Sequence, residues 1–165
     1  MDKISSQRTH DDLYLKENRK LEPKEYFKFI KKHSEDYLNN ISRPDILEIG
    51  CATGDFLWYI SKSFPQSKLT GIDIHPKLIE RAKTEVPEVE FFNGDVEKKS
   101  TLPNKKYDAV FMNGVHSIFD SFDIWIENIT SLLKSDGRAY IFGGFNPEPL
   151  DVIMRVRPSS SNAHW

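Results

Sequence analysis

The chain has 165 residues, of which 38% are hydrophobic and 29% are charged, and its formal net charge is −2. This length and composition predict one globular domain and exclude a fibrous or fully disordered chain. The charge supplies no basic face of the kind that nucleic acid or an anionic membrane requires, so we expect neither as a partner. Because the chain has one cysteine, no signal peptide and no apolar run of membrane-spanning length, we expect a cytoplasmic protein.

The N-terminal residues 1–44 are predicted to be a helical segment that packs on the rest of the domain. Residues 1–10 are polar and unpatterned, residues 11–18 favour a short helix, and Pro23 permits a new helix to start. After Pro23, apolar and aromatic residues recur at steps of three and four, which is typical of an amphipathic helix. This stripe consists of Tyr26, Phe27, Phe29, Ile30, His33, Tyr37 and Leu38, with His33 expected to be half-buried.

Residues 45–154 alternate between short apolar runs and helical patterns. The predicted strands are residues 46–49, 68–74, 89–92, 107–113 and 139–142, and the predicted helices are residues 55–64, 76–85 and 122–133. A turn at residues 135–138 is expected to end the last helix, and a further helix to start at residues 149–154. Strands that alternate with helices in this way indicate an α/β fold, with a parallel sheet and helices on both faces. Residues 155–165 are assigned to a polar tail.

The stretch from Asp45 to Phe56, DILEIGCATGDF, holds the most informative motif. An apolar strand breaks into small residues at Gly50, Ala52 and Gly54 and then enters a helix. Small residues suit a turn that passes close to a bound ligand, and the start of a helix offers unpaired backbone N–H groups. The even spacing differs from the G-x-G-x-x-G of dinucleotide-binding turns. An ordinary glycine-punctuated junction between strand and helix is the alternative.

With Glu48 two residues before Gly50, this stretch resembles motif I of the class I S-adenosylmethionine-dependent methyltransferases, acid-x-Gly-x-Gly-x-Gly, with Ala52 at the middle glycine position. The resemblance covers residues 46–145. It implies a Rossmann-like, doubly wound, mainly parallel sheet in the order 3-2-1-4-5, with S-adenosylmethionine as cofactor and S-adenosylhomocysteine as product. The two C-terminal strands of that family have no counterpart here. We therefore expect a truncated form, or a short variant whose fifth-strand edge is covered by a second copy or another partner.

The resemblance also assigns residues to the methionine end of the cofactor. Glu48 and the turn of Gly50, Cys51, Ala52 and Gly54 would hold this end, and Asn113 would accept a hydrogen bond from its amino group. Tyr14 would either reach the ligand or pack on the sheet. Cys51 is expected to be a small packing residue and not a reactive thiol.

Residues at the ends of the second and third strands would bind the nucleoside. Asp73 lies 19 residues after Gly54, near the offset of about 20 at which an acid binds ribose hydroxyls in nucleotide-binding folds. By the resemblance, Ile74 would pack on the adenine ring, while Asp95 and the Val96 N–H would bind its amine and its ring. A helix N-cap at Asp73 and an ordinary turn at residues 93–95 are the alternatives.

The resemblance implies in-line transfer of a methyl group, for which the protein mainly supplies alignment. We expect the acceptor to be a hydroxyl of a small molecule or glycan, with His116 as the base because its unperturbed pKa lies near neutrality. His116 orienting its loop is the alternative. Asp120 is either the partner of His116 or a helix N-cap, and residues 146–149 would shape the acceptor site. No metal site is predicted.

Two rival functions follow from the same residues. The first is a non-catalytic cofactor-binding subunit that acts through a partner, which fits the absent C-terminal strands. The second is a nicotinamide-dependent oxidoreductase, which the spacing of Gly50, Ala52 and Gly54 disfavours.

Overall fold

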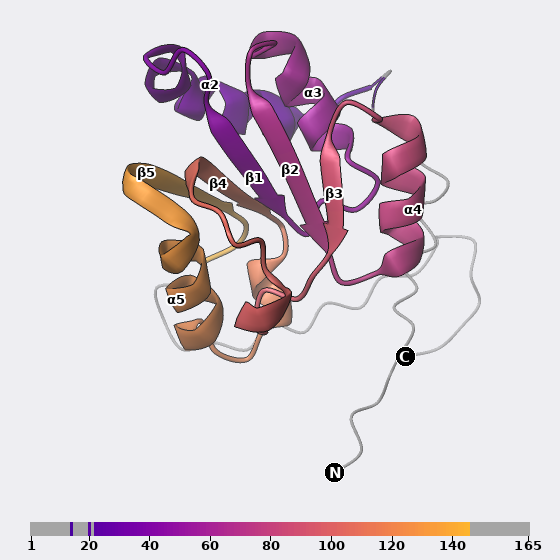
Figure 1. Cartoon of the computed structure of the whole chain (residues 1–165), viewed down its shortest axis with the longest axis vertical. Coiled ribbons are helices and arrows are strands. Elements are labelled where there is room, and N and C mark those ends of the chain that lie inside the picture. The colour runs from indigo at the N-terminus through magenta and orange to yellow at the C-terminus, as the bar shows by residue number, and fades with distance from the viewer. Residues whose placement is uncertain (1–13, 15–19, 21, 146–165) are drawn as a thin grey trace, which may run out of the picture.

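The computed structural model describes Tyr14, Lys20 and residues 22–145, which form a five-stranded sheet with helices on both faces (Figure 1). All the strands are parallel, and their order β3-β2-β1-β4-β5 confirms the predicted Rossmann-like topology. The order reverses between β1 and β4, so the topological switch point lies at the carboxyl end of β1. The strands are β1 (Asp45–Ile49), β2 (Lys68–Asp73), β3 (Glu90–Asn93), β4 (Tyr107–Asn113) and β5 (Leu133–Phe142).

The helices divide between the two faces of the sheet. Side chains of α2 (Glu25–Asn39), α3 (Asp55–Ser63) and α4 (Pro76–Glu85) share one buried cluster, which includes Leu57, Ile60 and Ala82. On the other face α5 (Asp123–Leu132) buries Trp125, Ile129 and Leu132 against β1 and β4. Two short 3-10 turns, η1 (Lys99–Thr101) and η2 (His116–Ile118), follow β3 and β4. The predicted arrangement with helices on both faces is therefore confirmed.

Helix α2 packs on the sheet as predicted, but its apolar stripe is narrower. It buries Phe27, Ile30, Ser34 and Leu38. Phe29 is 54% exposed, and His33 is exposed where we expected a half-buried residue. The two rings lie one helical turn apart on the solvent side, where their centroids are 4.3 Å apart. Phe29 also lies 6.2 Å from the ring of Phe142, so this side of α2 reaches only the margin of the core.

Strand β5 begins earlier than its sequence indicates. It follows α5 directly at Leu133, where we predicted a turn and then a strand from residue 139. Tyr107 pairs with Leu133 and Ala109 with Arg138, so residues 134–137 bulge out opposite Asp108. A Cβ on Gly137 would lie 2.7 Å from the Tyr107 carbonyl oxygen. The turn-forming residues are thus present, but they form a bulge inside the strand and not a helix-ending turn.

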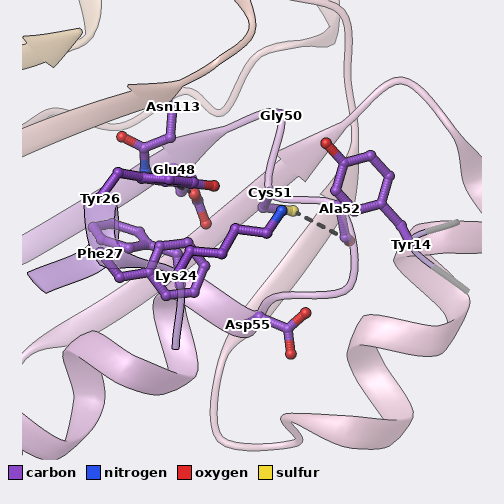
Figure 2. A pocket seen from close by; sticks show the side chains of 11 residues that line it. Tyr14, Lys24, Tyr26, Phe27, Glu48, Gly50, Cys51, Ala52, Asp55 and Asn113 are labelled. Atoms are coloured by element: carbon purple, nitrogen blue, oxygen red, sulfur yellow. Dashed lines mark hydrogen bonds between the residues drawn. The ribbon is translucent and has the colours of Figure 1, made fainter. Parts of the chain in front are cut away.

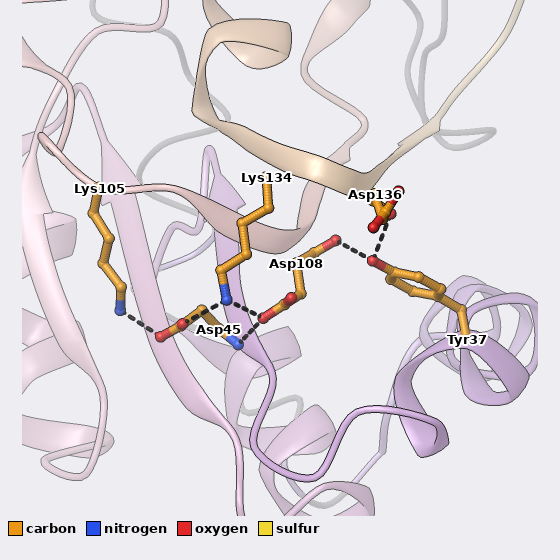
Figure 3. Close-up of polar contacts among 6 residues, drawn as sticks. All are labelled: Tyr37, Asp45, Lys105, Asp108, Lys134 and Asp136. Carbon is orange, nitrogen blue, oxygen red and sulfur yellow. Dashed lines mark hydrogen bonds and ion pairs between the residues drawn. The ribbon is translucent and has the colours of Figure 1, made fainter.

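A polar network joins the elements at the sheet end opposite the strand carboxyl ends (Figure 3). The Lys134 ammonium donates to Asp108 Oδ2 at 2.7 Å and to Asp45 Oδ2 at 3.0 Å, and Lys105 pairs with Asp45 Oδ1 at 2.6 Å. The Tyr37 hydroxyl lies within hydrogen-bond distance of the carbonyl oxygens of Asp108 and Asp136. The network ties α2, β1, β4 and β5 together, away from the switch point.

Several predicted segments lie outside the described residues. They are residues 1–10, the helix of residues 11–18 apart from Tyr14, residues 146–149, the helix start at 149–154 and the tail at 155–165. The division of the chain at residues 44 and 154 stays a prediction, as does a partner on the β5 edge. None of the helices in the described part has the length and apolar character needed to cross a membrane.

Candidate functional site

The turn after β1 lies at the carboxyl end of the strand and contains three residues in the left-handed backbone conformation. The N–H groups of Gly50 and Cys51 donate to the Ile72 carbonyl oxygen at 2.8 and 3.0 Å, which fastens the turn to β2. The φ angles of Gly50, Ala52 and Gly54 are +71°, +45° and +81°. A left-handed conformation costs a residue with a Cβ about 1–2 kcal/mol. Ala52, at the middle glycine position of the motif, is therefore the strained residue of this turn.

The glycines of the turn make room for protein side chains. A Cβ on Gly50 would lie 2.3 Å from Val115 Cγ2, and one on Gly54 would lie 2.7 Å from Phe91 Cζ. We expected small residues here because of a nearby ligand, and the structure adds a second reason at Gly50 and Gly54. At these two positions the left-handed backbone and the neighbouring side chains already require glycine.

Glu48 and Asn113 form a buried polar pair at the switch point. Asn113 follows the β4 residue Met112, which pairs with Ile49 of β1, and its Nδ2 donates to Glu48 Oε1 at 3.0 Å. Glu48 is only 3% exposed and Asn113 only 9%. Within the part of the chain that the structure describes, Glu48 Oε2 and Asn113 Oδ1 have no hydrogen-bond partner. The pair therefore presents two buried oxygen atoms without partners, and both are acceptors once Glu48 is ionised.

Burial dominates the electrostatics of this pair. It raises the pKa of Glu48 to about 8, against the opposing hydrogen bond from Asn113, and the nearby Asp55 and Asp73 add to the rise. Burial also raises the pKa of Asp55, and it raises that of the Cys51 thiol well above its usual value. Cys51 is therefore a protonated packing residue, in agreement with the sequence expectation.

A cavity that is open to solvent lies beside the pair (Figure 2). Its wall includes the predicted residues Tyr14, Glu48, Gly50, Cys51, Ala52 and Asn113. Sequence reasoning missed the remaining lining residues, which are Lys24, Tyr26, Phe27, Asp55 and Phe56. Asp55 follows Gly54 directly and was open to prediction from its position. Lys24 stands far from the motif, and no sequence pattern points to it.

The cavity suits an organic cation that donates hydrogen bonds. Glu48 Oε2 and Asn113 Oδ1 are buried acceptors, and leaving such atoms unpaired costs free energy. An ammonium group supplies the donors, and a carboxylate binds it more strongly than it binds a neutral group. The amino group of S-adenosylmethionine therefore fits this pair.

Asp73 joins the turn after β1 to the turn after β2. Its Oδ2 accepts a hydrogen bond from the Ala52 N–H and its Oδ1 one from the His75 N–H, both at 2.9 Å. The residue at the N-cap of α4 is His75, so the N-cap alternative for Asp73 is wrong. Asp73 is thus held in a defined position between the two turns.

The other predicted nucleoside residues lie outside the cavity wall. Ile74 is 52% exposed, so its side chain is accessible to a ligand. The Asp95 carboxylate accepts from the Glu97 N–H at 3.0 Å and pairs with Lys98 at 2.8 Å, which is ordinary turn chemistry. Val96 is buried in the core. Contacts of these residues with adenine stay predictions.

His116 lies in η2, also outside the cavity wall. Its Nε2 is 2.9 Å from the Gly144 carbonyl oxygen, and its ring stacks on Phe145 with centroids 4.4 Å apart. A Cβ on Gly143 would lie 1.7 Å from its Cε1. His116 Nδ1 is buried without a partner among the described residues. His116 therefore joins the loops after β4 and β5, and with Nε2 as the donor it keeps Nδ1 as an acceptor.

Two further sequence expectations concern Asp120 and metals. Asp120 is exposed, and the N-cap of α5 is Phe122, so the N-cap alternative for Asp120 is wrong. Within the described ranges, no group of three or more His, Cys, Asp or Glu side chains is arranged to hold a metal ion.

Comparison with known proteins places the chain in a family. A family model described as "Methyltransferase domain" matches residues 47–139. A malonyl-[acyl-carrier protein] O-methyltransferase of Ilyobacter polytropus is 35% identical over 117 residues, which are 66% of this chain and 43% of that protein. A trans-aconitate 2-methyltransferase of an Enterobacter species is 30% identical over 112 residues, 67% of this chain and 44% of that protein. The chain thus spans less than half the length of these relatives.

The fold has solved counterparts. The plantazolicin methyltransferase BpumL, in complex with S-adenosylhomocysteine, superposes with a TM-score of 0.64 at 23% identity, over 84% of this chain and 53% of that one. Together with the family match, this confirms the resemblance drawn from the turn after β1. The chain belongs to the class I S-adenosylmethionine-dependent methyltransferase family, whose cofactor is S-adenosylmethionine.

Proposed function

We propose that the chain binds S-adenosylmethionine at the switch point and supplies the cofactor-binding part of an O-methyltransferase that acts on a small-molecule acceptor. The observation that carries this proposal is the Glu48–Asn113 pair, with its two unpartnered buried acceptors beside an open cavity. The family match leaves no support for a nicotinamide-dependent oxidoreductase.

Residues on three strand ends would hold the cofactor. Glu48 and Asn113 would bind its amino group, and the Asp73 carboxylate would accept hydrogen bonds from the ribose hydroxyls. Ile74 would cover one face of the adenine ring, while Asp95 and Val96 would bind its edge. When bound, S-adenosylmethionine supplies a sulfonium methyl group that an oxygen nucleophile attacks in line with the breaking S–C bond. The residues themselves contribute position and exclusion of water.

The relatives favour an acid as the acceptor. Their names specify malonyl-[acyl-carrier protein] and trans-aconitate, both of which carry carboxyl groups. A carboxylate is already ionised at neutral pH and needs no base. The hydroxyl of a small molecule or glycan, which we predicted from sequence, would need one, and His116 Nδ1 is the nitrogen kept as an acceptor. The role of His116 therefore depends on the acceptor.

Calorimetric titration of the chain with S-adenosylmethionine and S-adenosylhomocysteine tests the first half of the proposal. Saturable binding to the wild type, lost in Glu48→Ala, is expected. A folded wild-type chain that binds neither compound contradicts the proposal.

Transfer from methyl-labelled S-adenosylmethionine tests the second half. A panel of malonyl thioester, trans-aconitate, simple alcohols and sugars separates acid acceptors from hydroxyl acceptors. With an acid acceptor we expect His116→Gln to keep its activity, and with a hydroxyl acceptor to lose it. Binding without transfer to any member would instead support a non-catalytic cofactor-binding subunit.

A further inference from the structure

The loops after β4 and β5 both reach the cavity wall. A Cβ on Gly50, which lines the cavity, would lie 2.3 Å from Val115 Cγ2 in the loop after β4. Tyr26, another lining residue, stacks on Phe142 at the end of β5, with ring centroids 5.1 Å apart. Both loops therefore border the place where we propose that the cofactor binds.

Phe145 presents an open aromatic face in the loop after β5. Its ring stacks on His116, with centroids 4.4 Å apart and 17° between the two planes. His116 is only 9% exposed, and its Nε2 lies 2.9 Å from the Gly144 carbonyl oxygen, so this ring is held in place. Phe145 is nevertheless 63% exposed. It therefore offers the face turned away from His116 to solvent, and flat apolar groups pack well on such a face.

Among the described residues, nothing in the structure requires glycine at position 144. The backbone of Gly144 is not in the left-handed conformation, and a Cβ on it would meet no described atom within 4 Å. At Gly50 and Gly143, by contrast, an added Cβ would lie 2.3 and 1.7 Å from a neighbouring side chain. The space beside Gly144 is therefore open where the protein itself is described, and it adjoins Phe145 in the chain.

We propose that Gly144 and Phe145 form the part of the acceptor site that selects a carboxylic acid with a flat, apolar body. This inference rests on the proposed function, because the acid would be the acceptor of the methyl group. Its body would stack on the open face of Phe145 and pass over the backbone of Gly144, where a side chain would obstruct it. Acids without such a body would reach the same site but would lack this contact.

Three acids separate this selection from general binding of carboxylates. Cinnamate has a flat aromatic body, hexanoate has a flexible apolar body, and acetate has neither. Each acid is titrated into the chain saturated with S-adenosylhomocysteine, and binding is followed by NMR signals of the acid. Because S-adenosylhomocysteine has no methyl group to donate, this measures binding without turnover. The wild type should bind cinnamate about tenfold more tightly than acetate, and more tightly than hexanoate.

Variants of Phe145 test the stacking contact. Phe145→Ala should weaken cinnamate binding about tenfold and change acetate binding less than about twofold, whereas Phe145→Tyr keeps the ring and should keep most of the affinity. Phe29→Ala is the matched control. Phe29 is 54% exposed and also lies against a histidine, His33, with centroids 4.3 Å apart, but it belongs to α2. This control should leave the affinity for all three acids unchanged.

Gly144→Ala tests the open space. Because no described atom obstructs the added methyl group, the chain should fold with an unchanged or slightly higher midpoint in urea. Cinnamate binding should nevertheless weaken about tenfold, since the methyl group occupies the path of the ligand. A purely structural role of Gly144 predicts the reverse result, which is a less stable chain with unchanged cinnamate binding, and that result would overturn the assignment of Gly144.

Equal affinity of the wild type for cinnamate and acetate would overturn the inference. Unchanged cinnamate binding in Phe145→Ala would overturn it as well. Failure of the proposed function is a different result, in which the wild type does not bind S-adenosylhomocysteine at all, and it would overturn both proposals. Titration with S-adenosylhomocysteine alone, before any acid is added, distinguishes the two cases.

Discussion

Asn113 Nδ2 donates to Glu48 Oε1 at 3.0 Å across 65 residues of sequence, and the second oxygen of each side chain is buried without a partner in the described part of the chain. An isolated buried acceptor pair would be a poor way to stabilise a fold, because each unsatisfied atom retains its desolvation cost. The pair is therefore better explained as half of a binding site than as a structural contact.

The first prediction concerns Glu48→Gln. Because burial raises the pKa of Glu48 to about 8, its carboxyl is mostly neutral at pH 7 in the unliganded chain, and an amide of the same shape replaces it with little change. We expect the free energy of unfolding to change by less than about 1 kcal/mol. Affinity for S-adenosylmethionine should fall about tenfold or more, because the amide lacks the negative charge. Urea unfolding and titration calorimetry measure the two quantities separately.

Binding should also release a proton. An ammonium ligand stabilises the ionised form of Glu48, so affinity should rise with pH up to about 8, until the amine of the ligand deprotonates. The folding stability of the unliganded chain should depend on pH in the opposite direction. The raised pKa makes the folded state hold the proton more tightly, so stability is highest below the unfolded value and declines as pH rises toward 8. Titrations at pH 7 in buffers of different ionisation enthalpy report the released proton directly.

Two variants assign that proton. Glu48→Gln should abolish the release. Asp55→Asn should leave most of it, although burial also raises the pKa of Asp55. Proton release that persists in Glu48→Gln but disappears in Asp55→Asn would transfer the role to Asp55.

Substitution of Asp73 should affect both stability and binding. Its carboxylate accepts the N–H groups of Ala52 and His75, so Asp73→Ala leaves two backbone donors without their acceptor. We expect a loss of about 1–3 kcal/mol in unfolding free energy together with loss of cofactor binding. A ligand change avoids this double effect. For the wild-type chain, an S-adenosylhomocysteine analogue without the ribose hydroxyls should bind more weakly, and equal affinity would show that Asp73 only braces the turn.

The polar network at the opposite end of the sheet should affect stability alone. Lys134→Met removes the donor to Asp45 and Asp108, and since the Lys134 side chain is 40% exposed we expect a loss of only about 1 kcal/mol. Burial of Asp45 opposes the lowering of its pKa, but hydrogen bonds from Lys105 and Lys134 outweigh it. A lowered pKa contributes stability above the unfolded value, so the difference between variant and wild type should narrow below about pH 4.

Urea unfolding at pH 7 and pH 3 measures how the stability difference between Lys134→Met and wild type changes with pH. Lys77→Met, at an exposed lysine of α4, is the control. Cofactor affinity should be unchanged in both variants. A loss of affinity in Lys134→Met would show that the network also positions the switch point.

Gly143→Ala should disturb the loops that His116 joins. The added Cβ would lie 1.7 Å from His116 Cε1, so the ring or the loop must move, at a cost of about 1–3 kcal/mol. In a His116→Ala background the same substitution should cost much less, since the ring is gone. A double-mutant cycle of thermal unfolding measures this coupling, and additive effects would place the ring elsewhere in solution.

Local signals were sufficient for most of the elements. The apolar run at 107–113, the proline that opens α4 and the spaced small residues after β1 each depend on neighbours within a few positions, and the structure confirms all of them. Strand β5 was misjudged because residues 135–138 form a good turn in isolation. Only pairing with β4 converts that turn into a bulge.

In the candidate site, too, some residues could be predicted from local sequence and others only from the tertiary structure. Glu48, Gly50 and Asp73 were predictable because each lies at or just after the carboxyl end of a strand, and parallel strands bring these ends together. The bond between Glu48 and Asn113 required the register of β1 against β4, which pairs Ile49 with Met112. Lys24 required the packing of α2 over the cavity, which no spacing in the chain encodes. Periodicity reports which residues share a strand or helix face, whereas the distance between residues on different elements is set by how those elements pack.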